Sequence, residues 1–168
     1  CDFQNGGVKG APKFPQPMLL EALLGYWFRT QETSYLDLVN LTLNKMACGG
    51  IYDQIGGGFH RYSTDPVWLV PHFEKMLYDN ALLARVYLHG YQTGDGNQFY
   101  RKIAEGVLDY VTREMTDSNG GFFTSQDADS AGGEGEFYIW SKQEIISVLG
   151  PDDGATFCNY FGVTDQGN

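Results

Sequence analysis

One stretch decides the fold: residues 48–80, which read CGGIYDQIGGGFHRYSTDPVWLVPHFEKMLYDN. Its glycines allow close backbone packing and positive φ angles. Pro66 and Pro71 exclude a regular helix before His72, and each pushes the preceding residue toward extended geometry. A strong helical pattern follows over residues 73–93. The stretch is therefore predicted to be a long ordered loop that leads into a helix, a setting in which functional residues are frequent.

Apolar residues at helical spacing lie on both sides of this loop. Ser141 and Glu144 form the pattern of a capping box, which starts a helix, and the Gly-Asp-Gly of residues 94–96 marks a tight turn. Residues 122–125 and 137–140 are strand-like, and we expect them to pair as a β-hairpin with a long acidic tip. The predicted helices span residues 18–30, 33–47, 73–93, 99–115, 141–150 and 153–161.

A pair of glycines followed by apolar or aromatic residues occurs at Gly6-Gly7, Gly49-Gly50 and Gly120-Gly121. Pairs of helices joined by short turns lie between these positions. Because two antiparallel helices return the chain to the end it left, the long loops should gather at one end. We therefore predict an all-α fold of about three helical hairpins, with short β-hairpins in the long loops, as a single domain over residues 1–168. The long loops are residues 1–17, 48–72 and 117–140.

The chain is acidic, with a net charge of −10 and a sequence pI near 4.5. This charge disfavours binding to nucleic acid or to anionic lipid, both of which require a basic face. No apolar run reaches membrane-spanning length, and the three cysteines include no Cys-x-x-Cys pair of a zinc ribbon or dithiol site. Since the chain begins at Cys1 and not at methionine, we expect a cytoplasmic fragment of a longer protein from which targeting signals are missing.

Four motifs resemble the YyaL-like family, also called the spermatogenesis-associated, thioredoxin-domain-containing family. The motifs are long and specific, and together they cover most of the chain. They read GAPKFP at residues 10–15, GGIYDQIGGGFHRYS at 49–63, WLVPHFEKMLYDN at 68–80 and SQDADS at 125–130.

The resemblance implies a particular architecture. Proteins of that family are similar to a thioredoxin-like domain followed by a six-hairpin α/α toroid. This chain looks like the first half of the toroid, without the thioredoxin-like domain and without the second half. Six-hairpin toroids host glycoside hydrolases, sugar epimerases and lyases, with the site at the mouth of the barrel. The reaction type follows from this resemblance only by analogy of fold.

The predicted helix that follows the long loop begins with polar residues. His72, Lys75 and Asp79 fall at i, i+3 and i+7 and would share one face, which becomes apolar further along. This pattern indicates a polar pocket mouth above an apolar core. Glu74 and Tyr78 form an i, i+4 pair beside it. In the structural alternative, Glu74 only favours the positive end of the helix dipole, and Lys75 pairs with Asp79.

His60 and Arg61 stand between the glycines and the proline-containing segment. An imidazole can act as acid or base near neutral pH, and an arginine can hold a carboxylate or stabilise an anion. With His72, these residues would supply the base and the acid that sugar epimerisation needs on opposite faces. In the structural alternative they belong to a packed loop, in which Arg61 pairs with Asp65 or Asp53.

Residues 126–136 form an acidic, glycine-rich loop. Glycoside hydrolysis requires two carboxyl groups, and this loop offers four, among them Asp127 and Asp129, with Gln126 beside them. Asp79 and Glu74 would face the loop across the barrel. A calcium loop of the EF-hand type needs an acid at the twelfth position, where Tyr138 stands, so that match fails. In the structural alternative, the loop is a solvated turn whose aspartates bond the backbone.

We therefore predict a carbohydrate-processing site, of glycoside hydrolase or sugar epimerase type, in one concave pocket at the long-loop face. We expect no metal and no cofactor. The aromatic residues would stack on sugar rings or, alternatively, pack the loops as a hydrophobic cap. The predicted catalytic residues are His60, His72, Asp79, Asp127 and Asp129. The predicted substrate-binding residues are Arg61, Tyr62, Trp68, Glu74, Lys75, Tyr78, Gln126 and Tyr138, with Trp68 and Tyr78 as the floor of the pocket.

A non-catalytic binding or scaffold module is the second function class that the sequence allows. In that case the same pocket docks a peptide or the thioredoxin-like domain. The two classes differ in whether the carboxylates and histidines converge on one open point or pair off with one another. The expected ligand is a sugar or another small molecule, with no nucleic acid or membrane partner. The fragment is expected to self-associate, because half a toroid leaves apolar helix faces uncovered.

Overall fold

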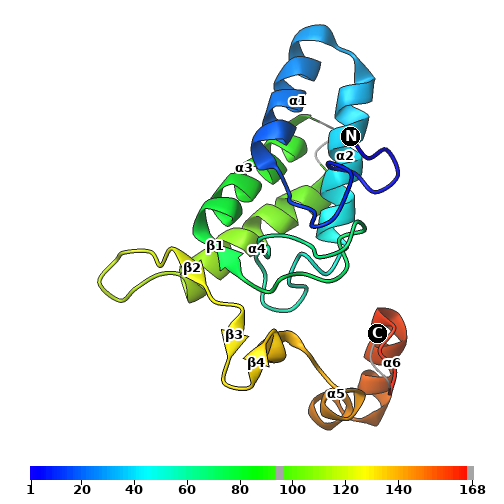
Figure 1. Cartoon of the computed structure of the whole chain (residues 1–168), viewed down its shortest axis with the longest axis vertical. Helices are drawn as coiled ribbons and strands as arrows, with labels where there is room; N and C mark the ends of the chain where they lie inside the picture. The colour runs from blue at the N-terminus through cyan, green and yellow to red at the C-terminus, as the bar shows by residue number, and fades with distance from the viewer. Residues whose placement is uncertain (94–96, 166–168) are drawn as a thin grey trace. The chain divides into compact units, whose positions relative to one another are not determined.

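The computed structural model describes residues 1–93 and 97–165, and it divides the chain into two compact units, Cys1–Asp129 and Ser130–Asn168 (Figure 1). The predicted all-α fold class is confirmed: within the described residues, long helices follow one another in hairpins, and only short strands lie between them. The predicted tight turn at residues 94–96 lies outside the described residues.

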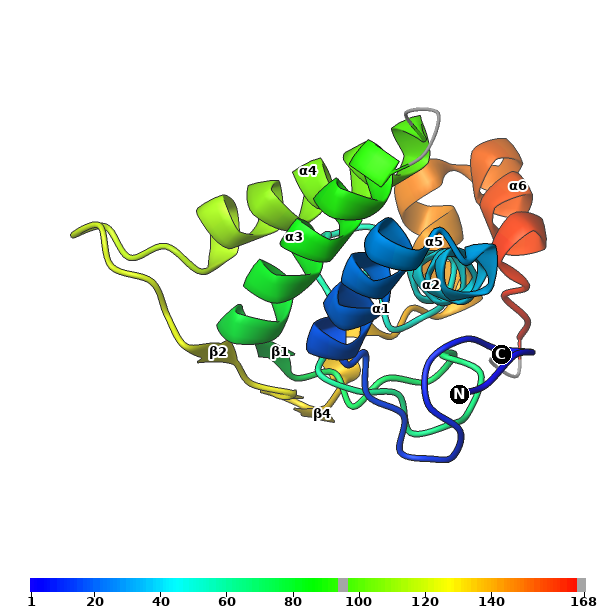
Figure 2. The same cartoon turned by 90° about the horizontal axis from the view of Figure 1, so that it is seen from above.

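Unit 1 contains helices α1 (Pro17–Thr30), α2 (Thr33–Ala47), α3 (Leu77–Thr93) and α4 (Gln98–Glu114). Pro17 occupies the first turn of α1, where its missing N–H costs no hydrogen bond. The Asn97 side chain accepts a hydrogen bond from the Phe99 N–H and so caps α4. Helices α1 and α2 pack as one hairpin and α3 and α4 as another, and α1 also lies beside α3 (Figure 2).

The core of unit 1 lies between these helices and the loop of residues 48–76. Apolar residues at helical spacing from each helix meet there and are removed from water, which is the main favourable contribution to folding. The fully buried members of this core are Val39, Leu43, Met46, Ile51, Phe59, Trp68, Leu83, Val86, Tyr87 and Val107.

The start of α3 differs from the prediction. The helix begins at Leu77 and not at residue 73, because Phe73 has a positive φ of 66° that no α-helix contains. The next residues form strand β1 (Lys75–Met76), which pairs antiparallel with β2 (Ser125–Gln126). The prediction that His72, Lys75 and Asp79 share one helical face is therefore wrong, because His72 and Lys75 precede the helix.

Three loop segments gather at one end of unit 1, as the hairpin topology predicts. Lys13 and Ser63 exchange backbone hydrogen bonds, which joins the first loop to the long loop. The Trp68 indole N–H donates to the Asn5 carbonyl at 2.8 Å. The Leu77 N–H donates to the Thr124 carbonyl and brings the segment after α4 to the start of α3.

Unit 2 contains helices α5 (Lys142–Leu149) and α6 (Pro151–Phe161). The predicted capping box is confirmed: the Ser141 and Glu144 side chains each accept a hydrogen bond from the other residue's backbone N–H. Strand β3 (Asp129–Ser130) pairs with β4 (Gly133–Glu134), and η1 (Glu136–Tyr138) follows as a 3₁₀ turn. The predicted hairpin of residues 122–125 with 137–140 is wrong, since residues 125–126 pair with β1 instead.

Candidate active site

A short irregular ribbon positions the predicted site residues of unit 1. The His72 N–H donates to the Tyr62 carbonyl, and the Arg61 N–H donates to the Glu74 carbonyl at 2.8 Å. These bonds hold two segments side by side although ten or more residues separate them in the chain. The positive φ of Phe73 turns the second segment into β1. Strained backbone of this kind persists only where the surrounding structure imposes it, and it is frequent at functional sites.

Arg61 and Glu74 form an ion pair at the N-terminal end of α3, with 3.0 Å between Nη1 and Oε2. Their side chains are 41% and 24% exposed. Hydrogen bonds to Glu74 and to the Tyr78 hydroxyl raise the pKa of Arg61 further above its usual range. The structural alternatives of Asp65 or Asp53 as partner of Arg61 are wrong, because Asp65 accepts backbone hydrogen bonds from its own loop.

Asp79 lies in the first turn of α3 and is 9% exposed. Burial raises its pKa to about 6, because water can no longer solvate the ionised form. The positive charge of Arg61 opposes this rise, whereas the negative charge of Glu74 adds to it. A carboxyl group with this pKa is half protonated near pH 6 and still about one-tenth protonated at pH 7, which suits proton transfer.

Three rings stack beside the ion pair. The Tyr62 and His72 rings lie 4.7 Å apart with 19° between their planes. The ring of Phe14, which is 39% exposed, lies 4.9 Å from the Tyr62 ring and is tilted by 37° against it. Phe14 comes from the first loop, so two loops build this stack. The sequence analysis did not assign Phe14, although it falls within the GAPKFP motif.

The Lys75 side chain is buried and bonded to neighbouring groups of the protein, whereas the sequence predicted a substrate-binding role for it. Its side chain is 1% exposed, and its ammonium group donates to Asp53 Oδ2 at 2.8 Å and to the Gly57 carbonyl at 2.9 Å. The same group lies 4.3 Å from the centre of the Tyr110 ring. The alternative pairing of Lys75 with Asp79 is also wrong. Burial alone would raise the pKa of Asp53, but the charge of Lys75 and the hydrogen bonds from Lys75 and from the backbone N–H groups of Gly56 and Ile55 together lower it.

His60 and Trp68 are likewise part of the core. His60 is 2% exposed and packs edge-on against Phe73, and burial together with the charge of Lys75 lowers its pKa to about 4. It is therefore neutral at physiological pH and shielded from ligands. Trp68 is fully buried with its indole N–H bonded to Asn5, so it cannot form the floor of an open pocket.

The acidic loop begins beside this arrangement, because Gln126 of β2 pairs with Lys75 of β1. Asp127 and Asp129 are both exposed, and Asp127 accepts a hydrogen bond from the Asp129 N–H, as expected of a solvated turn. Gln126 accepts a hydrogen bond from the buried Tyr110 hydroxyl at 2.7 Å. Tyr138 belongs to unit 2, so it is not assigned to the site in unit 1. The structure therefore brings together Arg61, Tyr62, His72, Glu74, Tyr78 and Asp79.

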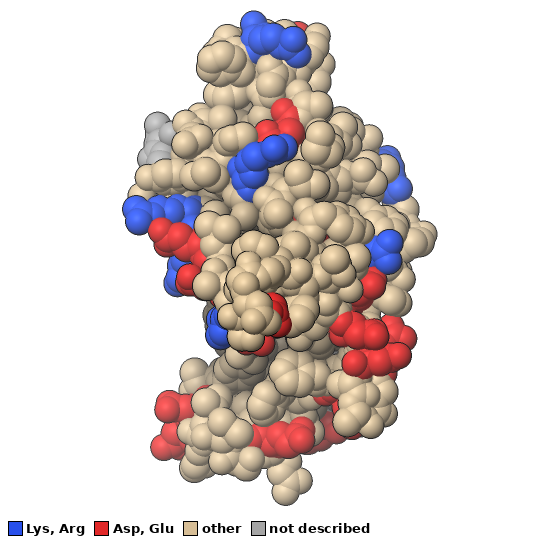
Figure 3. All heavy atoms as spheres, turned by 90° about the vertical axis from the view of Figure 1, so that its left-hand side faces the viewer, with Lys and Arg blue, Asp and Glu red and all other residues tan. Residues whose placement is uncertain are grey.

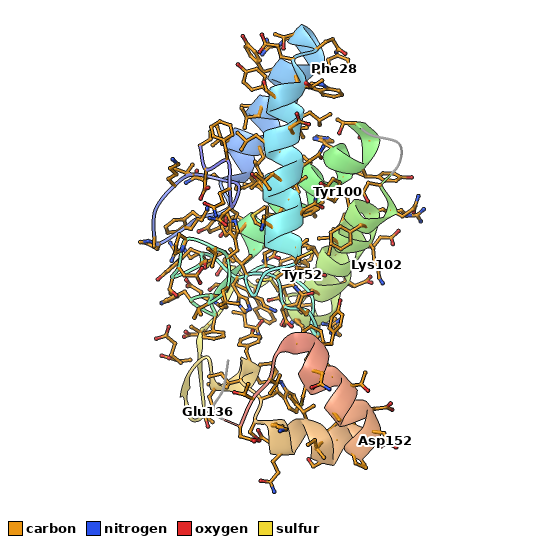
Figure 4. The ribbon with its side chains drawn as sticks, turned by 90° about the vertical axis from the view of Figure 1, so that its right-hand side faces the viewer. Phe28, Tyr52, Tyr100, Lys102, Glu136 and Asp152 are labelled. Atoms are coloured by element: carbon orange, nitrogen blue, oxygen red, sulfur yellow. The ribbon has the colours of Figure 1, made fainter. Side chains whose placement is uncertain are left out.

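A cavity of about 340 Å³ lies elsewhere, between α2, the end of α3 and the start of α4. Its lining includes Asn40, Asn44 and Tyr100, and none of the predicted site residues. Tyr100 reaches from α4 to α2, where its hydroxyl donates to the Asn40 carbonyl at 3.2 Å (Figure 4). This cavity is therefore not the concave pocket predicted at the long-loop end.

Over residues 1–93 and 97–165, no three His, Cys, Asp or Glu side chains gather as metal ligands would. Within the same ranges, no helix combines the length and the apolar character needed to cross a bilayer.

The chain is similar to curated proteins over 99% of its length. Identity is 43% with human Spermatogenesis-associated protein 20, 41% with the mouse protein of that name, and 35% with an uncharacterized protein of Caenorhabditis elegans. The chain covers 24%, 23% and 25% of these proteins, respectively, so it spans about a quarter of their length. No protein-family model matches the chain.

Solved structures of sugar-converting enzymes share the fold. Cellobiose 2-epimerase from Bacillus thermoamylovorans matches with a TM-score of 0.65 at 15% identity, over 75% of this chain and 35% of the enzyme. A sugar epimerase from a ruminal bacterium matches with a TM-score of 0.65 at 13% identity, over 95% of this chain and 48% of that one. D-mannose isomerase matches less closely, with a TM-score of 0.54 at 19% identity, over 68% and 29%. The chain therefore has the fold of part of an α/α toroid.

Proposed function

We propose that unit 1 carries a carbohydrate-processing site at the N-terminal end of α3, of the acid–base type that epimerises or isomerises an aldose. Asp79 supports this proposal most directly. It is a buried carboxyl group with a pKa of about 6, placed beside the Arg61–Glu74 ion pair. Two carboxyl groups in unlike environments are a recurrent basis for paired acid and base roles.

The proposed mechanism assigns each group a step. The protonated Asp79 donates a hydrogen bond to the carbonyl oxygen of the open-chain sugar, while the Glu74 carboxylate takes the proton from the neighbouring carbon. Arg61, which is ion-paired with Glu74, steadies negative charge on the sugar oxygens. Transfer of the Asp79 proton to the carbonyl oxygen gives a neutral enediol. A proton from water then adds to carbon 2 on the opposite face, Asp79 takes back the hydroxyl proton, and Glu74 gives its proton to water, which yields the epimer. Phe14 and Tyr62 offer ring faces to the apolar side of the sugar.

The experiment is proton exchange in the full-length protein. D-mannose and cellobiose are incubated in D₂O, and NMR follows deuterium at carbon 2 and the appearance of the epimer. We expect exchange with the native protein and a loss of at least 100-fold in Asp79→Asn, the size expected for removal of an acid–base group. Asp37→Asn, an exposed change on α2, is the matched control and should retain the native rate. Equal exchange in both variants would contradict the proposal.

A binding or scaffold module is the second candidate, and the paired charges favour it. Lys75 with Asp53, and Arg61 with Glu74, are already partnered within the protein. If sugar binds without any exchange at carbon 2, the scaffold function replaces the catalytic one.

A further inference from the structure

A second polar cluster lies where α1 and α3 pack side by side (Figure 2). The Glu21 carboxylate is shared by two side chains of α3. Arg85 Nε donates to Glu21 Oε1 at 3.0 Å, and His89 Nδ1 lies 2.9 Å from Glu21 Oε2. The sequence analysis assigned none of the three. Arg85 and His89 are four residues apart and so share a helix face, but Glu21 comes from another helix and gives no sequence signal.

The cluster presents hydrogen-bonding groups to its exposed side. Glu21 is 19% exposed, whereas Arg85 and His89 are 49% and 41% exposed. Because the Glu21 contact uses Nε of Arg85 and Nδ1 of His89, the terminal amino groups of Arg85 and Nε2 of His89 are the atoms left for a ligand. The guanidinium and imidazole planes are fixed by the shared carboxylate. Planar groups fixed in this way suit the neighbouring hydroxyls of a sugar ring.

The cluster continues the proposed active site along α3. Tyr78, Leu82, Arg85 and His89 stand at i, i+4, i+7 and i+11, so they form one stripe on the helix surface. Tyr78 adjoins Arg61 at the active-site end. With a rise of about 1.5 Å per residue, Arg85 lies about 10 Å further along the helix axis than Tyr78, and His89 about 16 Å. This spacing exceeds the length of a single sugar ring.

Apolar side chains accompany the stripe. Tyr78 is 50% exposed and Leu88 43% exposed on α3, and Met18 is 61% exposed on α1. In Figure 3, acidic and basic side chains on one side of unit 1 adjoin in small groups, and uncharged surface separates the groups. A surface that combines isolated hydrogen-bonding groups with apolar contacts fits a neutral carbohydrate better than a charged ligand.

We propose that Glu21, Arg85 and His89 form a second sugar subsite, so that the ligand of this protein is a disaccharide or a longer oligosaccharide. This inference rests on the proposed function, because it takes the reacting ring to lie beside Arg61 and Asp79. The following part of the ligand then extends along α3 from Tyr78 toward Arg85 and His89.

The test is calorimetric binding of D-glucose and cellobiose to the full-length protein. We expect cellobiose to bind at least tenfold more tightly than glucose. Arg85→Ala and His89→Ala should each remove most of this difference and leave glucose binding unchanged. Arg101→Ala is the matched control, since Arg101 is an exposed, ion-paired arginine on α4. Glu21→Gln keeps the shape of the side chain and should weaken cellobiose binding alone.

The outcomes separate the two proposals. Equal binding of both sugars, or a cellobiose preference that survives Arg85→Ala and His89→Ala, would overturn the second subsite and leave the active site in place. Failure of both sugars to bind would overturn both proposals. Circular dichroism spectra that match the native protein show that each variant is folded.

Discussion

At the scale of single residues, unit 1 contains two kinds of buried ionisable side chain. Lys13 and Lys75 are almost fully buried and fully partnered: Lys13 donates to Asp2 and the Pro66 carbonyl, and Lys75 to Asp53 and the Gly57 carbonyl. Asp79 is different, because burial raises its pKa to about 6. The lysines therefore fasten the loops, whereas Asp79 is a group whose protonation changes near neutral pH.

The raised pKa of Asp79 makes a prediction about stability. The folded protein holds this proton more tightly than the unfolded chain, so the free energy of unfolding should fall as the pH rises from about 4 to about 6. Asp79→Asn should remove this contribution and, with partial solvent screening, stabilise the protein by about 1–2 kcal/mol at pH 7. Urea unfolding at pH 4, 5, 6 and 7 measures the difference. A constant difference between native protein and variant across this range would show that Asp79 has an ordinary pKa.

The Lys75–Asp53 pair makes a second prediction. Lys75→Ala leaves a largely buried carboxylate without its cation and should lower the free energy of unfolding by about 3–5 kcal/mol. Lys102→Ala is the control, because Lys102 lies exposed on α4 (Figure 4), and it should change stability by less than about 0.5 kcal/mol. Similar losses in the two variants in urea unfolding would contradict a structural role for Lys75.

At the scale of elements, the sequence predicted the helices well and the start of α3 poorly. Periodic apolar residues and capping signals are local features of the sequence. They predicted the first and last residues of α1, α2 and α4 to within a residue or two. The pairing of β1 with β2 is not local, since about 50 residues separate Lys75 from Gln126 in the chain. The positive φ of Phe73 is also imposed by the surrounding loops, and phenylalanine gives no signal for it.

The difference between local sequence signals and contacts of distant segments also explains which site residues could be predicted. The motifs pointed to the segment from Arg61 to Asp79, but they could not say which polar residues face inward. His60 and Lys75 have the residue types of catalytic groups and are buried by tertiary packing, whereas Phe14 is brought in from another loop. Composition and spacing carry no information about such contacts.

The glycines of the long loop make a third prediction, at the element scale. Gly58 has a φ of +81°, and a Cβ there would collide with the ring of Tyr110. Gly120 has a similar φ of +88° but open space around it. Gly120→Ala should therefore cost about 1–2 kcal/mol from backbone strain alone. Gly58→Ala should cost about 1–3 kcal/mol more because of overpacking. Thermal unfolding compares the two, and equal losses would mean that the loop does not pack on α4 as described.

At the scale of the whole molecule, the chain holds two compact units and spans about a quarter of its curated relatives. Large apolar side chains remain exposed in both units, among them Met18 and Phe28 in unit 1 and Ile139 and Tyr160 in unit 2. Exposed apolar surface of this kind usually marks an interface. These residues support the expectation that the chain requires further protein to cover its helix faces.

We therefore expect the isolated 168-residue chain to self-associate. Sedimentation velocity over a range of concentrations should show species larger than the monomer, because uncovered apolar faces gain free energy by meeting. Phe28→Ser and Met18→Ser together should reduce this association. A monomer that persists at high concentration and unfolds only at high temperature would contradict the expectation.

The proposed function depends on Asp79 acting as a proton-transfer group beside the Arg61–Glu74 ion pair. The most direct measurement is a ¹³C NMR titration of the Asp79 carboxyl carbon in the full-length protein, with the resonance assigned by its loss in Asp79→Asn. The account predicts a titration midpoint near pH 6. It also predicts a lower midpoint in Glu74→Gln, because the negative charge of Glu74 helps to raise the pKa of Asp79. A midpoint at or below pH 4 in the native protein would show an ordinary carboxylate and contradict the claim.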